Sequence, residues 1–270
     1  MLPAVIIHAI HLRDSPAERM TMSEGFKDPG ARHGRHLVVL SGAGISAESG
    51  LRTFRAEDGL WEEHRLEDIA TPQAFRRDPE QVLRFYDDRR IQVRRARPNA
   101  AHKALAELEQ AGFRVSVITQ NIDDLHERAG SREVMHLHGE ILKSRSSVDY
   151  GLRYPLPRGG IRLGDLCDKG SQLRPDVVWF GEAVPLYAIA EELAAEADLL
   201  LIVGTSLKVM PASNLYAAAP LDAPIILVDP DAHELAEPGV LPLAENAGQA
   251  LPRLVRHWLY QGHLGLPDTL

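Results

Sequence analysis

Residues 36–50 read HLVVLSGAGISAESG, a short apolar run that leads into a glycine-rich loop. The continuous apolar run, residues 36–40, favours a parallel strand that is buried on both faces. Gly42 and Gly44 then allow a tight turn and a close approach of the backbone to a pyrophosphate, and Ala47 takes the third small position of the G-x-G-x-x-G/A pattern. Such a loop can also be a plain turn, but its place directly after a strand favours nucleotide binding.

Four further short apolar runs repeat the strand pattern. They lie at residues 115–118, 177–180, 199–203 and 225–228. Stretches with apolar residues at helical spacing accompany them, at residues 79–97, 100–111, 186–195 and 251–260. Strands that alternate with helices predict an α/β fold with a Rossmann-like doubly wound parallel sheet.

Two segments interrupt this alternation and are interpreted as insertions that form a smaller lobe. Residues 56–97 are charged and helical in pattern, whereas residues 141–174 are rich in Gly, Pro, Arg and Ser. Residues 1–34 show no sustained periodicity, so we expect a partly disordered N-terminal extension there. The folded domain would span residues 35–265, and its large lobe would consist of residues 35–55, 98–140 and 175–265.

The composition is that of an ordinary soluble globular protein, with 44% hydrophobic and 25% charged residues in a chain of 270. A formal net charge of -8 argues against a general nucleic-acid binder, which would need clustered Lys and Arg. The single cysteine, Cys167, excludes an intrachain disulfide and fits a reducing cytoplasm. No stretch reaches the ~18 apolar residues of a membrane helix, and the N-terminal run 2–10 is a poor signal peptide. We therefore expect a cytoplasmic protein that binds no membrane.

Polar side chains gather after the predicted strand 115–118. Residues 119–126 read TQNIDDLH, and residues 136–140 read HLHGE. Amides and a carboxylate at the carboxyl end of a central strand lie where open α/β sheets bind ligands, and they can bond a ribose and a carboxamide. A histidine at a neighbouring strand end can move a proton near neutral pH.

Each of these residues also has a plainer interpretation. Asn121 and Asp123 could cap a helix, and His136 or His138 could be a core histidine with satisfied hydrogen bonds. Hydride transfer is disfavoured, because no acidic residue ends a strand about 20 residues after the loop, as dinucleotide-binding dehydrogenases require. The joint arrangement behind a phosphate loop nevertheless favours a reactive site.

Six motifs, taken in order, resemble the motif set of the sirtuin family. They are Gly42-Ala43-Gly44-Ile45-Ser46 with Gly50, Thr53-Phe54-Arg55, Thr119-Gln120-Asn121-Ile122-Asp123, His138-Gly139-Glu140, Val177-Val178-Trp179-Phe180-Gly181-Glu182 and Gly204-Thr205-Ser206. The resemblance covers about residues 36–260 and is greatest to bacterial sirtuins of the CobB type. It implies an NAD-dependent protein-lysine deacylase, which moves the acyl group to ADP-ribose and releases nicotinamide.

The resemblance also implies a role for individual residues. His138 would be the general base, and Asn121 would also be catalytic. Asn121 and Asp123 would serve the nicotinamide-ribose pocket. Asp229 stands where the family commonly places Asn, so the ribose contact there would differ. The residues expected to bind NAD are Gly42, Ala43, Gly44, Ser46, Glu48, Thr53, Phe54, Arg55, Trp61, Gln120, Asn121, Ile122, Asp123, His138, Gly204, Thr205, Ser206, Asp229 and Ala247.

A second group of residues is expected to bind the substrate. By resemblance, Val177, Val178, Trp179, Phe180 and Gly181 pair with an extended acyl-lysine peptide. Trp179 and Phe180 could equally be core aromatics.

Tyr86 and Arg89 lie three residues apart and therefore on one helical face. Without a family context, Tyr86 would be core and Arg89 solvated. Their spacing, however, matches the Tyr and Arg by which succinyl-preferring sirtuins hold the distal carboxylate of the acyl group. The resemblance thus implies desuccinylase as well as deacetylase activity, with Ala56 leaving room beside the acyl channel.

The chain departs from the family in its smaller lobe, where sirtuins usually carry two Cys pairs that bind zinc. Cys167 is the only cysteine, and residues 141–174 contain no His, so we predict no metal site. Cys167 is expected to be a small buried apolar residue. The lobe would be held instead by the packing of Val148, Tyr150, Leu152, Tyr154, Leu156, Ile161 and Leu163.

Two other functions remain open at this point. An ADP-ribosyltransferase or NAD hydrolase would use the same cofactor chemistry on another nucleophile or on water. A non-catalytic NAD-sensing module would bind NAD without reacting. His138 discriminates between them, because a sensor needs no base there.

Overall fold

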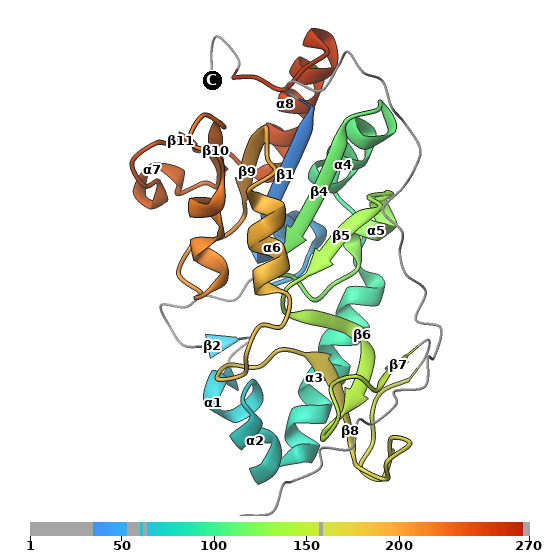
Figure 1. The fold of residues 1–270 in the computed structure, drawn as a ribbon. Coiled ribbons are helices and arrows are strands. Elements are labelled where there is room, and N and C mark those ends of the chain that lie inside the picture. The colour runs from blue at the N-terminus through green and yellow to red at the C-terminus, as the bar shows by residue number, and fades with distance from the viewer. Residues whose placement is uncertain (1–34, 53–59, 62–63, 157–158, 267–270) are drawn as a thin grey trace, which may run out of the picture. The chain divides into compact units, whose positions relative to one another are not determined.

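The computed structural model describes residues 35–52, 60–61, 64–156 and 159–266, with residues 60–61 described for the backbone alone. A six-stranded sheet, in the order β11-β10-β9-β1-β4-β5, organises them (Figure 1). All its pairings are parallel. The strands are β1 (His36–Ser41), β4 (Arg114–Thr119), β5 (Glu133–His136), β9 (Leu199–Val203), β10 (Ile225–Val228) and β11 (Val240–Leu243). The doubly wound parallel sheet is thus confirmed, and its strand order reverses at β1, which pairs with β4 on one side and β9 on the other.

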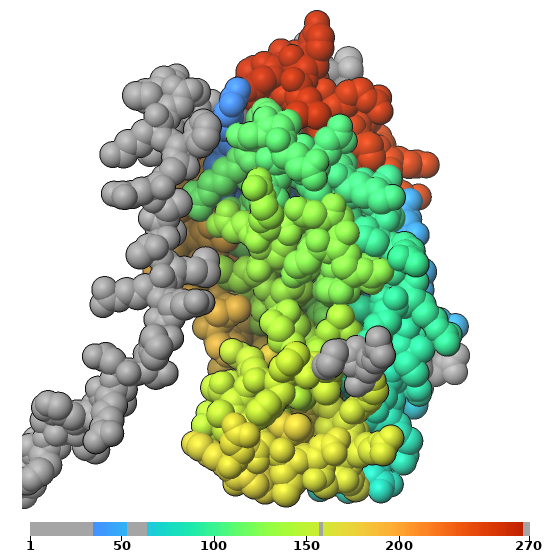
Figure 2. Space-filling model, turned by 90° about the vertical axis from the view of Figure 1, so that its right-hand side faces the viewer, coloured from blue at the N-terminus to red at the C-terminus, as the bar shows by residue number. Residues whose placement is uncertain are grey.

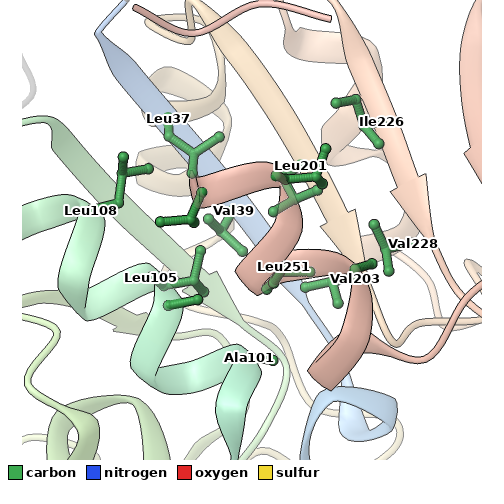
Figure 3. Close-up of a cluster of buried hydrophobic side chains, with 14 of the residues drawn as sticks. Leu37, Val39, Ala101, Leu105, Leu108, Leu201, Val203, Ile226, Val228 and Leu251 are labelled. Carbon is green, nitrogen blue, oxygen red and sulfur yellow. The ribbon is translucent and has the colours of Figure 1, made fainter. Parts of the chain in front are cut away.

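Helices cover both faces of this sheet, which is why the side chains on both faces of its central strands are buried and mostly apolar. Successive side chains of a strand point to opposite faces. Leu37 and Val39 accordingly pack in one cluster with α4 (Ala100–Gln110) and α8 (Ala247–Gln261), as Figure 3 shows. Val38 and Leu40 pack in another cluster, with α6 (Tyr187–Ala194) and the 3-10 helix η2 (Ala212–Ala218).

A second, antiparallel sheet of three strands has the order β7-β6-β8. Its strands are β6 (Gly139–Ser146), β7 (Arg153–Pro155) and β8 (Leu173–Val177). The long helix α3 (Pro79–Arg95) contacts β6 and β8, and Asp78 caps its first turn by accepting from Gln81 N. In Figure 2, residues of β6 to β8, yellow-green to yellow, gather at the end opposite the red α8.

The shorter elements connect these sheets. The 3-10 helix η1 (Ala43–Ser49) follows β1, and α5 (Leu125–Ala129) follows β4. The others are β2 (Leu60–Trp61), β3 (His64–Arg65), α1 (Leu66–Ile69), α2 (Pro72–Arg77) and α7 (Ala232–Leu235).

One strand prediction is wrong. The apolar run 177–180 is not a strand of the parallel sheet, because β8 ends at Val177 and pairs antiparallel with β6. The run looked like a buried strand because Val177 and Trp179 are indeed buried, with exposed fractions of 4% and 2%.

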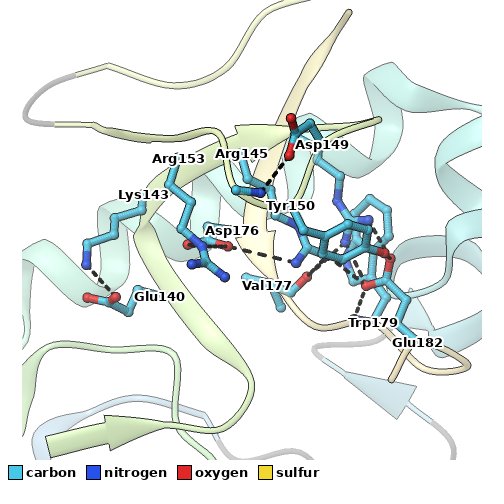
Figure 4. A network of polar contacts seen from close by, with 12 residues as sticks. Glu140, Lys143, Arg145, Asp149, Tyr150, Arg153, Asp176, Val177, Trp179 and Glu182 are labelled. Carbon is cyan, nitrogen blue, oxygen red and sulfur yellow. Dashed lines mark hydrogen bonds and ion pairs between the residues drawn. The ribbon is translucent and has the colours of Figure 1, made fainter. Parts of the chain in front are cut away.

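The packing predicted for residues 141–174 is also wrong in part. Ile161 and Cys167 are buried, but Val148, Tyr150 and Leu163 are 64%, 48% and 47% exposed. Charged side chains such as Arg145 and Asp176 are buried in this region instead. Figure 4 shows the network of polar contacts that they form.

Glu182 is the centre of that charged network. It accepts from Arg174 at 2.6 Å and from Arg145 at 3.0 Å, and it also receives the Trp179 backbone N–H. Asp176 pairs with Arg153 at 3.1 Å. Burial disfavours the charged form of Glu182, but the two arginines and the Trp179 N–H outweigh it and lower its pKa. Removing one member of such a buried network leaves an uncompensated charge, so the network ties β6 and β8 to the segment that follows them.

Candidate active site

A cavity of about 570 Å³ opens at the carboxyl edge of the parallel sheet. Residues that follow four of its strands line the cavity: Gly42 after β1, Gln120 after β4, Gly204 after β9 and Asp229 after β10. The cavity therefore lies at the point where the strand order reverses, the usual ligand site of open α/β sheets. Its opposite wall is formed by α3 and the segment after β8, through residues such as Tyr86, Arg89 and Trp179.

The glycine-rich loop packs against the loop after β9. A Cβ atom on Gly42 would lie 2.7 Å from Gly204 O, and one on Gly44 would lie 2.6 Å from Gly204 Cα. The N–H groups of Gly42 and Gly44 donate to Val203 O and Gly204 O. Both glycines are thus required by this close approach of protein backbone, because a side chain at either position would collide with the loop after β9.

Ser46 connects this loop to the polar cluster after β4. Its hydroxyl donates to Asp123 Oδ2 at 3.1 Å and accepts from Asn121 Nδ2 at 3.3 Å. Burial raises the pKa of Asp123, although the bonds from Leu125 N and Ser46 oppose that shift. Asp123 Oδ1 also accepts from Leu125 N at the start of α5, although the N-cap position of this helix is Asp124. Asn121, in contrast, makes no such bond and belongs to the site.

His138 lies at the base of the cavity, two residues beyond the end of β5. Its Nδ1 is 3.1 Å from Gln120 O. A carbonyl can only accept, so Nδ1 carries the hydrogen and Nε2 of the neutral ring keeps its lone pair. Burial lowers the pKa of His138, against the bond to Gln120 O, which raises it. The ring is therefore neutral near pH 7, with one nitrogen ready to accept a proton.

Tyr86 and Arg89 are both buried in the cavity wall, which overturns the solvated alternative for Arg89. The Tyr86 oxygen accepts from Trp179 Nε1 at 3.0 Å, and burial raises the pKa of this phenol far above its usual value. Arg89 is 5% exposed and donates to Gln92 Oε1 at 2.9 Å and to Arg52 O at 3.2 Å. A phenol and a guanidinium thus lie side by side in a largely apolar wall.

The segment after β8 has one core and one exposed aromatic. Trp179 is buried, with the Arg174 guanidinium 3.2 Å from its ring centroid, so its core interpretation holds. Phe180 is 43% exposed at the cavity and is tied by its backbone N–H to Ala70 O. Val178 N donates to His138 O at 2.9 Å, which joins this segment to the histidine.

A second hollow, of about 180 Å³, continues from the first beyond Gly204 and Asp229. Ala47, Glu48 and Ala247 line it. Glu48 Oε2 accepts from Gly248 N at 2.7 Å, in the first turn of α8. Burial raises the pKa of Asp229, and its Oδ1 accepts from Asp231 N.

The structure brings together the predicted residues that it describes and adds others. Thr53, Phe54, Arg55 and Ala56 and the side chain of Trp61 lie outside the described residues. Sequence reasoning missed several lining residues, among them Lys208, Val209, Met210, Pro211, Asp231 and Glu234. These residues follow β9 and β10 within a few positions. Because both strands were predicted, the place of these residues after the carboxyl ends of the strands could have identified them as part of the site.

Two absences concern only the part of the chain that the structure describes. There, no three His, Cys, Asp or Glu side chains form a group that could hold a metal ion. No helix among those residues is long and apolar enough to cross a membrane.

Comparisons with known proteins agree on one family. Residues 42–211 match the model of the Sir2 family. An NAD-dependent protein deacylase of Helicobacter pylori (strain ATCC 700392 / 26695) is 52% identical over 222 residues, which cover 82% of this chain and 96% of the relative. The structure of a Sir2 homologue, a point mutant in complex with ADP-ribose, is 42% identical with a TM-score of 0.77, covering 87% of this chain and 96% of that one. A Sir2 structure with a p53 peptide and NAD+ is 30% identical with a TM-score of 0.66, covering 85% and 94%.

Proposed function

This chain belongs to the Sir2 family, and we propose that it is an NAD-dependent protein-lysine deacylase, which moves an acyl group from lysine to ADP-ribose and releases nicotinamide. The observation that carries this proposal is the cavity itself. It joins a glycine-rich loop at the switch point of the sheet to His138, a partly buried histidine whose hydrogen bond leaves one nitrogen as a base. A module that only sensed NAD would have no use for that base.

The residues present fit NAD, which supplies the ADP-ribose that accepts the acyl group. The small residues Gly204, Thr205 and Ser206 leave room for the adenosine ribose and phosphate, and Asp229 can accept from a ribose hydroxyl. The smaller hollow beside Ala247 would take the adenine. Asn121 and Asp123 would hold the nicotinamide ribose, since Ser46 fixes both side chains beside the loop.

His138 would remove a proton from a ribose hydroxyl so that this oxygen can attack the acyl carbon. The reaction requires a base that is unprotonated near neutral pH, and burial keeps His138 in that state. The bond from Nδ1 to Gln120 O orients the ring, so that Nε2 is the nitrogen that accepts.

The substrate would enter as an extended peptide between the segment 178–181 and the loop after β9. Support comes from Phe180 and Gly181, which are exposed at the cavity, and from Met210, which is 62% exposed on its other side. Main-chain pairing reads the backbone of a peptide with modest demands on its side chains. The acyl group would then point toward Tyr86 and Arg89, which we propose bind a succinyl carboxylate.

We further propose the division into lobes given by the sequence, with residues 56–97 and 141–174 as the smaller one. The separate sheet β7-β6-β8 and its contacts with α3 support this division. The single cysteine, Cys167, supports a cytoplasmic location.

The proposed function predicts that an acetyl-lysine peptide is deacylated only when NAD is present. Mass spectrometry should show one acetyl-ADP-ribose and one nicotinamide for each lysine freed, because the acyl group is transferred and not hydrolysed. Turnover without NAD would contradict the proposal. ADP-ribose attached to the peptide, or free ADP-ribose without deacylation, would establish the transferase or hydrolase alternative instead.

The smaller lobe leads to a prediction about metal. We expect the purified protein to contain no stoichiometric zinc and to keep its melting temperature and its deacylase rate in excess EDTA. The physical reason is that the buried ion pairs of Glu182 with Arg145 and Arg174 join β6 and β8 where a metal would otherwise do so. Elemental analysis that found one zinc per chain, or a chelator-induced fall in melting temperature, would disprove this.

A further inference from the structure

His136 ends β5 and lies behind the candidate site, outside every role assigned so far. Its side chain is 8% exposed. Nδ1 is 2.9 Å from Asn121 O, and Nε2 is 2.7 Å from Glu127 Oε1 of α5. The ring thus joins an edge strand, a helix and the turn after β4.

The two partners decide the charge of this ring. A backbone carbonyl and a carboxylate are both acceptors, so both ring nitrogens must carry hydrogen and His136 is an imidazolium. Burial alone would lower the pKa of His136, but the hydrogen bond and the negative charge of Glu127 outweigh it and raise that pKa. The same contact lowers the pKa of Glu127, although burial opposes this. The pair is therefore ionic, and each bond is charge-assisted.

His138 provides an internal contrast two residues later. Its Nδ1 bonds Gln120 O, as that of His136 bonds Asn121 O, but no carboxylate among the described residues bonds its Nε2. Two histidines therefore bond the adjacent carbonyls of Gln120 and Asn121. His138 is neutral, whereas His136 is charged.

The residue that His136 holds in place is Asn121. Its backbone oxygen receives the His136 Nδ1 hydrogen, and its side-chain amide donates to Ser46, which bonds Asp123. Because the two bonds act on opposite sides of one residue, a shift of the carbonyl would move the amide in the cavity.

We propose that protonated His136, paired with Glu127, is a positioning residue that holds Asn121 in its place in the cavity for turnover, and that beside a carboxylate partner the ring holds Asn121 only while it is charged. The inference rests on the proposed deacylase function for its kinetic part alone.

Loss of the proton would weaken the arrangement. A neutral ring that keeps its bond to Asn121 O would turn a lone pair toward the Glu127 carboxylate. The charged groups that face His136 are Glu127 and Glu140, both of which raise its pKa, and Asp123, whose own pKa His136 lowers. Glu140 also pairs with Lys143, and His126 lies within electrostatic reach of His136. Since the pKa in the folded protein is raised above about 6.5, the positioning is complete below that pH and is lost as the pH rises through the folded pKa.

The test measures the protonation of His136 directly. In protein labelled with 15N at histidine and asparagine, both ring nitrogens of His136 should be protonated at pH 7, with the signals assigned by their absence from His136→Gln. The Asn121 side-chain amide signal should shift with the same apparent pKa as His136. A neutral His136 ring at pH 7, or an Asn121 amide that does not follow it, would overturn the proposal whether or not the chain proves to be a deacylase.

Two variants test the kinetic consequence in the full-length protein. Glu127→Gln offers the ring an amide that can donate to Nε2, so the neutral ring can hold Asn121. We expect near-normal kcat at pH 7 and loss of the alkaline fall in kcat that the proposal predicts for the wild type. His136→Gln should lower kcat about tenfold at all pH values, the size expected for one lost hydrogen bond to a charged donor, with little change in KM for NAD. If kcat of Glu127→Gln falls at alkaline pH as that of the wild type does, the role of the His136 charge is refuted. This variant tests the proposal even if His136→Gln fails to fold.

Discussion

Replacement of His138 by alanine is expected to lower the rate of acetyl-lysine deacylation by about 100-fold to 10,000-fold, the range for loss of a positioned general base. The structure gives a reason for a value toward the upper end. His138 is partly buried, and Gln120 O sets its tautomer so that Nε2 is unprotonated. Among the residues described here, it is the histidine that lines the cavity. Stopped-flow and steady-state rates with an acetyl-lysine peptide measure the effect.

NAD binding separates this result from simple loss of the fold. The affinity of His138→Ala for NAD, measured by calorimetry, should stay within a few-fold of that of the wild type, because most of the ribose and phosphate contacts are assigned to other residues. His257→Ala is the matched control, since this partly exposed histidine of α8 does not line the cavity. A variant of His138 that kept a tenth or more of the activity would mean that another group is the base.

The central strands were predictable because both their faces are covered. Strands β1, β4, β9 and β10 match continuous apolar runs to within one residue at each end. The edge strands β5 and β11 are not continuous apolar runs, so the sequence pattern did not predict them. Glu133–His136 is only partly buried, and Val240–Leu243 contains a proline, which edge strands tolerate.

The smaller sheet was not predictable from hydrophobic pattern, since its interior is partly ionic. Strand β8 contains Arg174 and Asp176, which are 5% and 3% exposed. Periodicity analysis counts such residues as polar and therefore places them on the surface. Only the partner identities, Glu182 for Arg174 and Arg153 for Asp176, explain why these charges are buried. Both partners lie outside β8, so the pattern of the strand itself gives no signal of them.

The candidate site was predicted well where its residues end strands of the parallel sheet. Ser46, Asn121, Asp123, His138 and Gly204 line one cavity for the geometric reason that carboxyl ends of parallel strands share an edge. The sequence does not decide whether His136 is a core histidine or part of the reactive site, because nothing local in HLHGE distinguishes the charged ring from the neutral one. The decisive feature is the carboxylate of Glu127, which α5 brings to within 2.7 Å.

The part of the cavity proposed to receive the acyl group would determine which acyl-lysine substrates this chain prefers. Val93, Ile141 and Val177 line it together with Tyr86 and the buried Arg89. A neutral acetyl group gains only apolar contact there, whereas a succinyl group would bring a carboxylate to a guanidinium that water scarcely reaches. Charge-assisted, bidentate pairing is strong in such surroundings, provided that both charges are satisfied. The same cation should therefore favour acidic acyl groups over neutral ones of equal length.

Arg89→Met is accordingly expected to raise KM for a succinyl-lysine peptide far more than for an acetyl-lysine peptide. The difference should be on the order of 2 to 5 kcal/mol, the loss attached to one partner of a buried charge pair. Methionine keeps much of the apolar length of arginine, so that the change removes mainly the charge and its donors. Arg89→Lys should recover only part of the preference, since an ammonium cannot form the two parallel bonds of a guanidinium.

The control is Arg84→Met, on the exposed face of the same helix, where the side chain is 68% accessible. This variant should change KM for neither peptide. Equal losses on the two peptides would show that Arg89 supports the wall through Gln92 and Arg52 and does not read the acyl group.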